Sequence, residues 1–398
     1  MPSVGPGTPP YQVRVVMSKT YRVGTQADLV RLAHVRGWIE SIAGAEESDD
    51  LLPTPYLDAR SSGMLPSTTV HTHPSYRLRL PSAIIHGRNL SLFIEDGAYP
   101  GGFAHSYMPS TDWQWVSETH VRYDLSSPQT VAQPAEMLGI VSHWGHFFVD
   151  ALDRLLDREA VARSTHPLLV GDADFFKLKP TLDEHGVVPQ VAELMHYLHI
   201  PMDFARLTAL SKTANYEVNN LLVATLPTIK PAISCEAVRE VRRCALQARE
   251  SVGGSHMSTI FVGRHDVKKR FLIGQSEVSD HLDKVHGAKT IFPENLTVAE
   301  AIDQFSGAKR VILPVGSAKF NLAFCRPGTK VLCVTPAGYV AQNGGIVVMM
   351  RHLCESLGLE LGFFGVETSG SARHLVNSDM RLRAEDADAM VNFLDGMP

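Results

Sequence analysis

The fold is decided by residues 311–336, which read VILPVGSAKFNLAFCRPGTKVLCVTP. The apolar run at 311–313 predicts a buried strand, and a tight glycine turn follows it. Apolar residues at helical spacing predict a helix over 318–325, and a Pro-Gly pair ends this helix before a second strand at 330–334. Strand, turn, helix and strand in this order form a βαβ unit.

The glycine turn of this unit has two interpretations. It brings backbone N–H groups to a helix start, which is a common phosphate site, so our hypothesis is that Gly316 and Ser317 hold the diphosphate of a nucleotide-sugar. Lys319 would add positive charge, and Asn321 would hydrogen-bond either the ligand or the turn. In the alternative interpretation, the glycine only allows a tight turn between two core elements.

Composition excludes several classes of protein. The chain has 398 residues, of which 44% are hydrophobic and 20% are charged, and its net charge is −5. This balance is typical of a globular protein with two or three domains. No basic stripe indicates nucleic acid, no apolar run approaches the roughly 20 residues of a membrane helix, and the first residues lack a signal-peptide pattern. We therefore expect a cytoplasmic protein with no membrane span, whose oligomeric state is open.

Cysteine usage agrees with that expectation. The five cysteines are odd in number and include no pair at CxxC spacing. Four of them lie in apolar or helical runs, which is typical of buried thiols in a reducing compartment. The sequence therefore predicts free thiols at Cys235, Cys244, Cys325, Cys333 and Cys354.

The N-terminal third changes character near residue 76. Residues 1–75 read as an extension, with a strand at 11–17, a helix at 26–45 and a long polar loop at 46–75. Residues 76–135 alternate short apolar runs with turn residues such as Pro81, which predicts antiparallel hairpins packed on the domain that follows.

The remainder of the chain alternates strands and helices. This pattern predicts an α/β domain at 136–250 and a second one at 256–398, joined by a Gly/Ser linker at 251–255. The long helix predicted at 234–250 would bridge the two halves. The fold class is therefore α/β, with two doubly wound domains facing a cleft.

The first constellation that could carry chemistry is HWGHFFVD, residues 143–150. At 100° per residue, one helix over 143–158 places His143, His146, Asp150 and Arg154 on one face. A His–Asp pair one turn apart can act as an oriented base. Two alternatives remain open. Asp150 pairs with Arg154 as an ordinary ion pair, or the two histidines and Asp150 hold the metal of a hydrolase.

Two further motifs lie in the last domain. GRHDVKKR, residues 263–270, follows a predicted strand, so Arg264 and Arg270 could clamp phosphate oxygens, or the segment is only a solvated basic loop. Thr297 and Glu300 form a Thr-x-x-Glu capping box before an apolar run. A contact between Glu300 and a ribose is the alternative role.

Three blocks of the chain together resemble glycosyltransferase family 61 over about residues 80–365. The blocks are HWGHFFVDALDRLL, IFVGRHDVKKRFLIGQSEV, and the segment from LTVAEAIDQF through the glycine turn to KVLCVTP. The positions that match the family pattern are His146, Asp150, Arg154, Arg264, Arg270, Glu300, Gly316, Asn321, Pro327 and Gly328.

The resemblance implies a GT-B-like pair of Rossmann-type domains that transfers a hexosyl or pentosyl group from a nucleotide-sugar to a hydroxyl of a glycan or other acceptor. It also implies an inverting reaction without a bound metal or other cofactor. Domain 136–250 would bind the acceptor and supply Asp150 or His146 as the base. Domain 256–398 would bind the donor through Arg264, Arg270, Glu300, Gly316, Ser317, Lys319 and Asn321.

The donor turn departs from the family pattern. Val315 stands where the family usually has His, and Ser317, Ala318 and Lys319 replace its Ala, Gly and Leu. The Asn expected after the basic block is replaced near Gly274-Gln275. These departures keep open an altered donor, or a relative that binds nucleotides or glycans without transferring sugar.

Overall fold

The computed structural model describes residues 18–397, except 24, 44–46, 59–60, 73–74, 88–89, 96, 100–113, 119, 126–127, 132–133, 140, 142, 157–163, 172–186, 212, 226–232, 251–256, 266–270, 343 and 370–377. The strand predicted at 11–17, the linker predicted at 251–255 and Arg270 lie outside these residues. The first lobe is defined as the described residues of 18–43 and 75–225, and the second lobe as those of 47–72 and 257–397.

The second lobe is built on a sheet whose five central strands are parallel. In space they follow the order β19-β17-β20-β21-β22. Numbered along the chain, this is the doubly wound order 2-1-3-4-5, which reverses between β17 and β20. The strands are β17 (Met257–Val262), β19 (Lys289–Ile291), β20 (Ala308–Pro314), β21 (Lys330–Pro336) and β22 (Glu360–Ser369).

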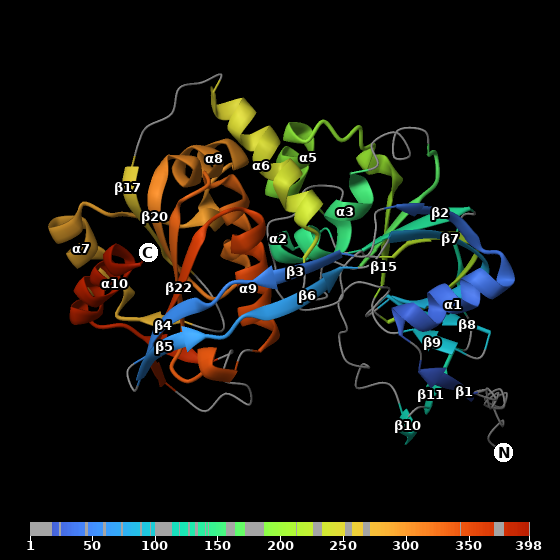
Figure 1. Ribbon diagram of the computed structural model, residues 1–398. Coiled ribbons are helices and arrows are strands. Elements are labelled where there is room, and N and C mark those ends of the chain that lie inside the picture. Colours follow the sequence, from blue (N-terminus) through green and yellow to red (C-terminus); the bar gives the residue numbers. More distant parts are fainter. Residues whose placement is uncertain are drawn as a thin grey trace, which may run out of the picture.

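Helices cover both faces of this sheet. Figure 1 shows α7 (Gln275–His286) and α10 (Ala384–Gly396) on one side, and α8 (Val298–Gly307) and α9 (Gly345–Ser356) on the other. These helices and strands form the alternating α/β pattern that is predicted for residues 256–398, and β20 and β21 contain the strands expected at 311–313 and 330–334. The helix after the glycine turn differs, because η6 (Ser317–Phe324) is a tighter 3-10 helix.

The second lobe also contains strands that the sequence pattern does not predict. The segment expected to be a loop at 46–75 forms four strands, and β4 pairs in parallel with β22. Figure 1 shows these blue strands lying against the C-terminal half. The loop prediction was wrong because tertiary contacts, not an apolar pattern, hold the strands. They are β3 (Glu47–Leu51), β4 (Thr54–Asp58), β5 (Ser61–Leu65) and β6 (Thr68–Thr72). Strands β3 and β6 form a separate two-stranded sheet, whereas β4, β5, β18 (Leu272–Ile273) and β23 (Asp379–Arg381) belong to the sheet of β22.

A buried arginine fastens this segment to the lobe. Arg351 of α9 is 2% exposed, and its guanidinium donates to the backbone carbonyls of Leu52 (2.9 Å) and Pro66 (2.7 Å) and to the hydroxyl of Thr54 (3.1 Å). A planar guanidinium carries five N–H donors in a fixed fork, against three on a lysine ammonium, so one side chain can satisfy several acceptors.

The first lobe combines a small parallel sheet with antiparallel hairpins. Its parallel strands follow the order β15-β14-β13-β16, or 3-2-1-4 along the chain, and the order reverses between β13 and β16. On its other side β16 pairs antiparallel with β7, which continues into the predicted hairpins. The parallel strands are β13 (Ala135–Gly139), β14 (Leu168–Gly171), β15 (Leu207–Leu210) and β16 (Asn215–Ala224).

Two predictions in the first lobe were wrong. The helix expected at 26–45 is α1 (Gln26–Arg36), which ends at Gly37 with φ 68°, and the remainder forms β2 (Ile39–Ala43). Pro81, which was expected to separate two short runs, lies instead within strand β7. The ladder to β16 has no pair at Pro81 and Asn220, so the N–H that proline lacks is not required there. The outer strands are β7 (Ser75–His86), β8 (Ser91–Ile94), β9 (Gly97–Tyr99), β10 (Gln114–Ser117), β11 (His120–Asp124), β1 (Ser18–Val23) and β12 (Gln129–Thr130).

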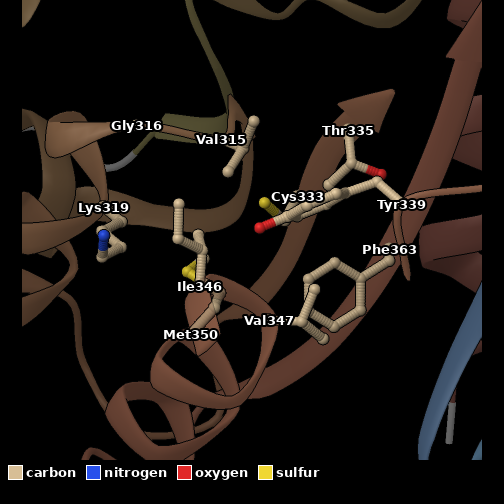
Figure 2. Close-up of a pocket in the computed structure, with 10 residues that line it drawn as sticks. All are labelled: Val315, Gly316, Lys319, Cys333, Thr335, Tyr339, Ile346, Val347, Met350 and Phe363. Carbon is tan, nitrogen blue, oxygen red and sulfur yellow. The ribbon is translucent and has the colours of Figure 1, made fainter. Parts of the chain in front are cut away.

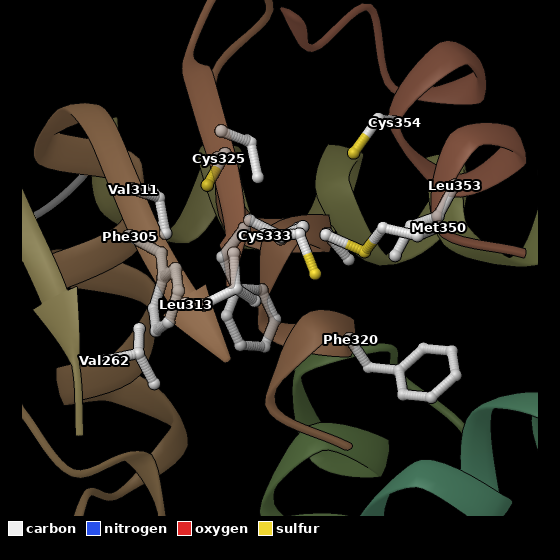
Figure 3. Close-up of a cluster of buried hydrophobic side chains, with 14 of the residues drawn as sticks. Val262, Phe305, Val311, Leu313, Phe320, Cys325, Cys333, Met350, Leu353 and Cys354 are labelled. Atoms are coloured by element: carbon white, nitrogen blue, oxygen red, sulfur yellow. The ribbon is translucent and has the colours of Figure 1, made fainter. Parts of the chain in front are cut away.

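The lobes share one continuous apolar core. The rings of Phe148 and Phe320 stack across the lobes with centroids 5.1 Å apart, and Figure 3 shows Phe320 pointing toward the first lobe. Helix α6 (Cys235–Glu250) contacts both lobes, as predicted for the bridging helix. All five cysteines are free, as predicted, and burial raises the pKa of the Cys325 and Cys333 thiols to about 12. Within the described residues, no helix is long and apolar enough to span a membrane.

Candidate functional site

The HWGHFFVD segment is not one regular α-helix. It consists of a short α-helical turn, α2 (Trp144–His146), a π-helical turn, η2 (Phe147–Ala151), and α3 (Leu152–Leu155). The prediction of one regular α-helix was therefore wrong, because the wider π turn changes the rotation per residue between 147 and 151. Asp150 lies within the π turn, and its side chain is outside the described atoms. Such turns often mark functional sites.

His143 starts this segment. Its Nδ1 accepts a hydrogen bond from the backbone N–H of His146 at 3.4 Å, and the two rings meet edge to face with centroids 5.1 Å apart. His146 is buried at the start of the π turn. The pair therefore presents two imidazoles close to the C-terminal end of β13, which is the edge where parallel strands bind ligands.

Arg154 occupies the point in the first lobe where the strand order reverses. Its side chain is 8% exposed, its Nη1 donates to the carbonyl of Leu138 at 2.7 Å, and its Nε donates to the carbonyl of Ala224 at 2.9 Å. These carbonyls belong to the ends of β13 and β16. Arg154 thus joins the two strands on either side of the reversal point, which is a structural role.

Arg264 occupies the equivalent point in the second lobe. It follows β17, and its Nη2 donates to the carbonyl of Val315, directly after β20, at 2.7 Å. The side chain of Gln275 holds its backbone, because its Oε1 accepts from the Arg264 N–H at 2.7 Å and its Nε2 donates to the Arg264 carbonyl at 3.2 Å. Gln275 was not predicted as a site residue. The signal available in the sequence was the position of Gln275 at the start of α7, shortly after the basic block 263–270.

The glycine turn lies beside Arg264 and touches the first lobe. A Cβ atom added at Gly145 would lie 3.0 Å from the Oγ of Ser317 and 3.1 Å from its Cβ, so a larger residue would push the two segments apart. Gly316 has φ 163°, an extended conformation that any residue can adopt. The structure therefore brings together three predicted segments, around residues 143–146, 264 and 315–317.

Lys319 and Asn321 lie in η6 and are both buried. The Nζ of Lys319, whose side chain is 8% exposed, lies 4.7 Å from the centroid of the Phe320 ring, within range of a cation–π interaction. The Nδ2 of Asn321 donates to the carbonyl of Ala318 at 3.1 Å, so the amide supports the turn.

A narrow, mainly apolar crevice, too tight to admit a water molecule, borders the turn. The hydroxyl of Thr335 is buried there without a hydrogen-bond partner among the described residues. Figure 2 shows the lining residues, which are Val315, Gly316, Lys319, Cys333, Thr335, Tyr339, Ile346, Val347, Met350 and Phe363.

Glu300 forms the predicted capping box. Its Oε2 accepts from the N–H and the hydroxyl of Thr297, both at 2.9 Å, and these bonds lower the pKa of the exposed carboxyl. A second carboxylate reaches the same helix start from the first lobe, because Glu193 accepts from the N–H groups of Val298 (2.7 Å) and Ala299 (3.1 Å). The start of α8 is thus occupied by side chains, which favours the capping role of Glu300 over a ribose contact.

Comparison with known families gives one match. The family model described as Glycosyltransferase 61 matches residues 144–332, a segment that contains the π turn, Arg264 and the glycine turn. No curated protein matches the chain. This match over residues 144–332 supports membership of glycosyltransferase family 61.

Proposed function

We propose that the protein moves a sugar from a nucleotide-sugar donor to an acceptor hydroxyl, with the donor diphosphate bound at the reversal point of the second sheet. The observation that carries this proposal is the hydrogen bond between Arg264 and Val315, which joins the segments after β17 and β20. In open α/β sheets, ligands bind outside the C-terminal ends of the strands at this point.

The groups at this point suit an anion. The guanidinium of Arg264 can bind two phosphate oxygens in parallel. The helix η6 begins at the same point, and the first N–H groups of a helix have no acceptor within that helix. Lys319 adds a second positive charge nearby. Fixed donors of this kind stabilise a departing diphosphate without a metal ion, and Arg270 would supplement them.

The acceptor would bind on the first-lobe side of the contact between Gly145 and Ser317. A donor site in one lobe and an acceptor site in the other would give a GT-B-like arrangement. Asp150 or His146 would take the proton of the acceptor hydroxyl. The acceptor oxygen then forms a bond to the anomeric carbon while the bond to the diphosphate oxygen breaks. Attack from the face opposite the leaving group inverts the anomeric configuration.

A donor and acceptor screen tests this proposal. Nucleotide-sugars are incubated with glycan acceptors, in the presence and absence of EDTA, and released nucleoside diphosphate is measured. We expect release that needs an acceptor and persists in EDTA, that falls at least about 100-fold in Asp150→Asn or His146→Ala, and that is unchanged in His34→Ala, an exposed histidine of the first lobe.

Two outcomes would oppose it. Full activity in both Asp150→Asn and His146→Ala would contradict the assignment of the base. Binding of a nucleotide-sugar without transfer to any acceptor and without donor hydrolysis would instead identify a non-catalytic binding protein.

A further inference from the structure

Three side chains on the outer face of the second lobe converge on one point. The Nε2 atoms of His281 and His286 lie 3.0 Å and 2.7 Å from the same carboxylate oxygen, Oδ1 of Asp388. One potential ligand atom from each residue lies within 4.8 Å of the other two. The histidines belong to α7 and the aspartate to α10, so the cluster joins two helices that are about 100 residues apart in the sequence.

The convergence is not a simple consequence of helix periodicity. Residues five apart on an α-helix point about 140° away from each other, at 100° per residue. His286 is the last residue of α7, before Gly287 with φ 61°, so its ring can turn toward Asp388 at the helix end. The ring centroids of the two histidines are 6.2 Å apart.

We propose that His281, His286 and Asp388 bind one divalent transition-metal ion of the zinc class, with water completing the coordination. Two imidazoles and a carboxylate suit zinc and its neighbours, whereas magnesium and calcium prefer oxygen ligands. A tetrahedral ion with bonds of about 2.0 Å separates its ligand atoms by about 3.3 Å, so small rotations of the side chains would make room for it.

The cluster is accessible to an ion from solvent. The side chains are 30%, 20% and 49% exposed for His281, His286 and Asp388. The ion would replace the hydrogen bonds between the imidazoles and the carboxylate with coordinate bonds and would fasten α7 to α10. Because Gln275 at the start of α7 holds the backbone of Arg264, this fastening would also steady the helix behind the proposed donor site.

Zinc titration of tag-free protein, previously treated with EDTA and desalted, tests the proposal. Calorimetry is expected to show one site of micromolar affinity or better, and a thermal melt is expected to shift upward with added ZnCl₂. His281→Gln and Asp388→Asn should each weaken binding at least about tenfold and remove the shift. His196→Gln removes an exposed histidine of α5 and serves as the matched control.

The result that overturns the proposal is a wild-type protein with no stoichiometric zinc site tighter than about 100 µM, or zinc binding that both ligand variants retain. Circular dichroism of each variant shows whether it is folded, and His286→Gln provides a further ligand deletion if one variant fails to fold. This outcome is independent of the proposed transfer reaction, because the experiment measures binding without donor or acceptor.

Discussion

Each lobe has an arginine where its strand order reverses, and the two arginines are used differently. Arg154 is buried, and its guanidinium joins the carbonyls of Leu138 and Ala224 at the ends of the flanking strands. Arg264 is half-buried beside a glycine turn, and its Nη2 donates to the carbonyl of Val315. The same topological position therefore serves structure in the first lobe and suits ligand binding in the second. Topology locates a candidate site, and the side chains decide how it is used.

The largest expected effect is on stability in the first lobe. Arg154→Met removes two charged hydrogen bonds and leaves two strand-end carbonyls without their partner, so we expect the free energy of unfolding to fall by about 3–5 kcal/mol. Arg264→Met acts at a half-exposed position, where water can replace the lost hydrogen bond to Val315, and should cost less than about 1.5 kcal/mol. Urea denaturation followed by circular dichroism measures both. Equal losses would mean that the two arginines have the same role.

The next effect is on ligand affinity in the second lobe. Arg264→Ala should weaken binding of a nucleoside diphosphate about 100-fold, because the bidentate contact is lost. Arg264→Lys should fall between wild type and Ala, since an ammonium group cannot bind two oxygens in parallel. Isothermal titration calorimetry measures the affinities. Arg243→Ala is the control, because Arg243 is exposed and pairs with Glu240 on α6, and an equal loss there would show that general charge is responsible.

The contact between the lobes gives a smaller effect. In Gly145→Val the new side chain meets Ser317 and pushes the first lobe away from the glycine turn. We expect turnover to fall about tenfold, since displacing reacting groups by a fraction of an ångström is costly, while diphosphate affinity stays within about twofold. Steady-state kinetics and calorimetry separate the two quantities. A parallel loss of affinity would place the diphosphate against residue 145.

The smallest expected effect is on the pH dependence of stability, and it involves Asp153, the neighbour of Arg154 in the sequence. Burial raises the pKa of Asp153 above its ordinary value, although the hydrogen bond that Ser234 donates acts in the opposite direction and lowers it. The folded state therefore favours the protonated carboxyl, and this contribution to stability is fully present below about pH 4 and is lost as pH rises through the raised pKa. Asp153→Asn should raise the melting temperature at pH 7 but not at pH 4. A difference that does not depend on pH would contradict this.

The sequence predicts the second lobe well because its strands and helices carry strong apolar periodicity. Strands β20 and β21 therefore lie at their expected positions, and the other central strands alternate with helices α7 to α10 as the pattern predicts. Strands β3 to β6 escape prediction because they depend on Arg351, which lies about 300 residues away in the sequence. No local pattern reports such a contact.

Prediction of the site was partial for similar reasons. Arg264 and the glycine turn do meet, because both follow adjacent parallel strands. The π turn interrupts the regular helix expected at 143–158, since sequence periodicity does not reveal a single wider turn. Glu193 binds the backbone N–H groups at the start of α8, about 105 residues away, and only the folded chain identifies this contact.

Hydrogen–deuterium exchange with and without a nucleoside diphosphate tests the central claim most directly. The account predicts slower exchange at the amides around residues 264–265 and 316–320, no protection at the Arg154 segment, and loss of the protection in Arg264→Ala. A nucleoside diphosphate that binds by calorimetry but protects other segments, or that protects these segments equally in Arg264→Ala, would contradict the account.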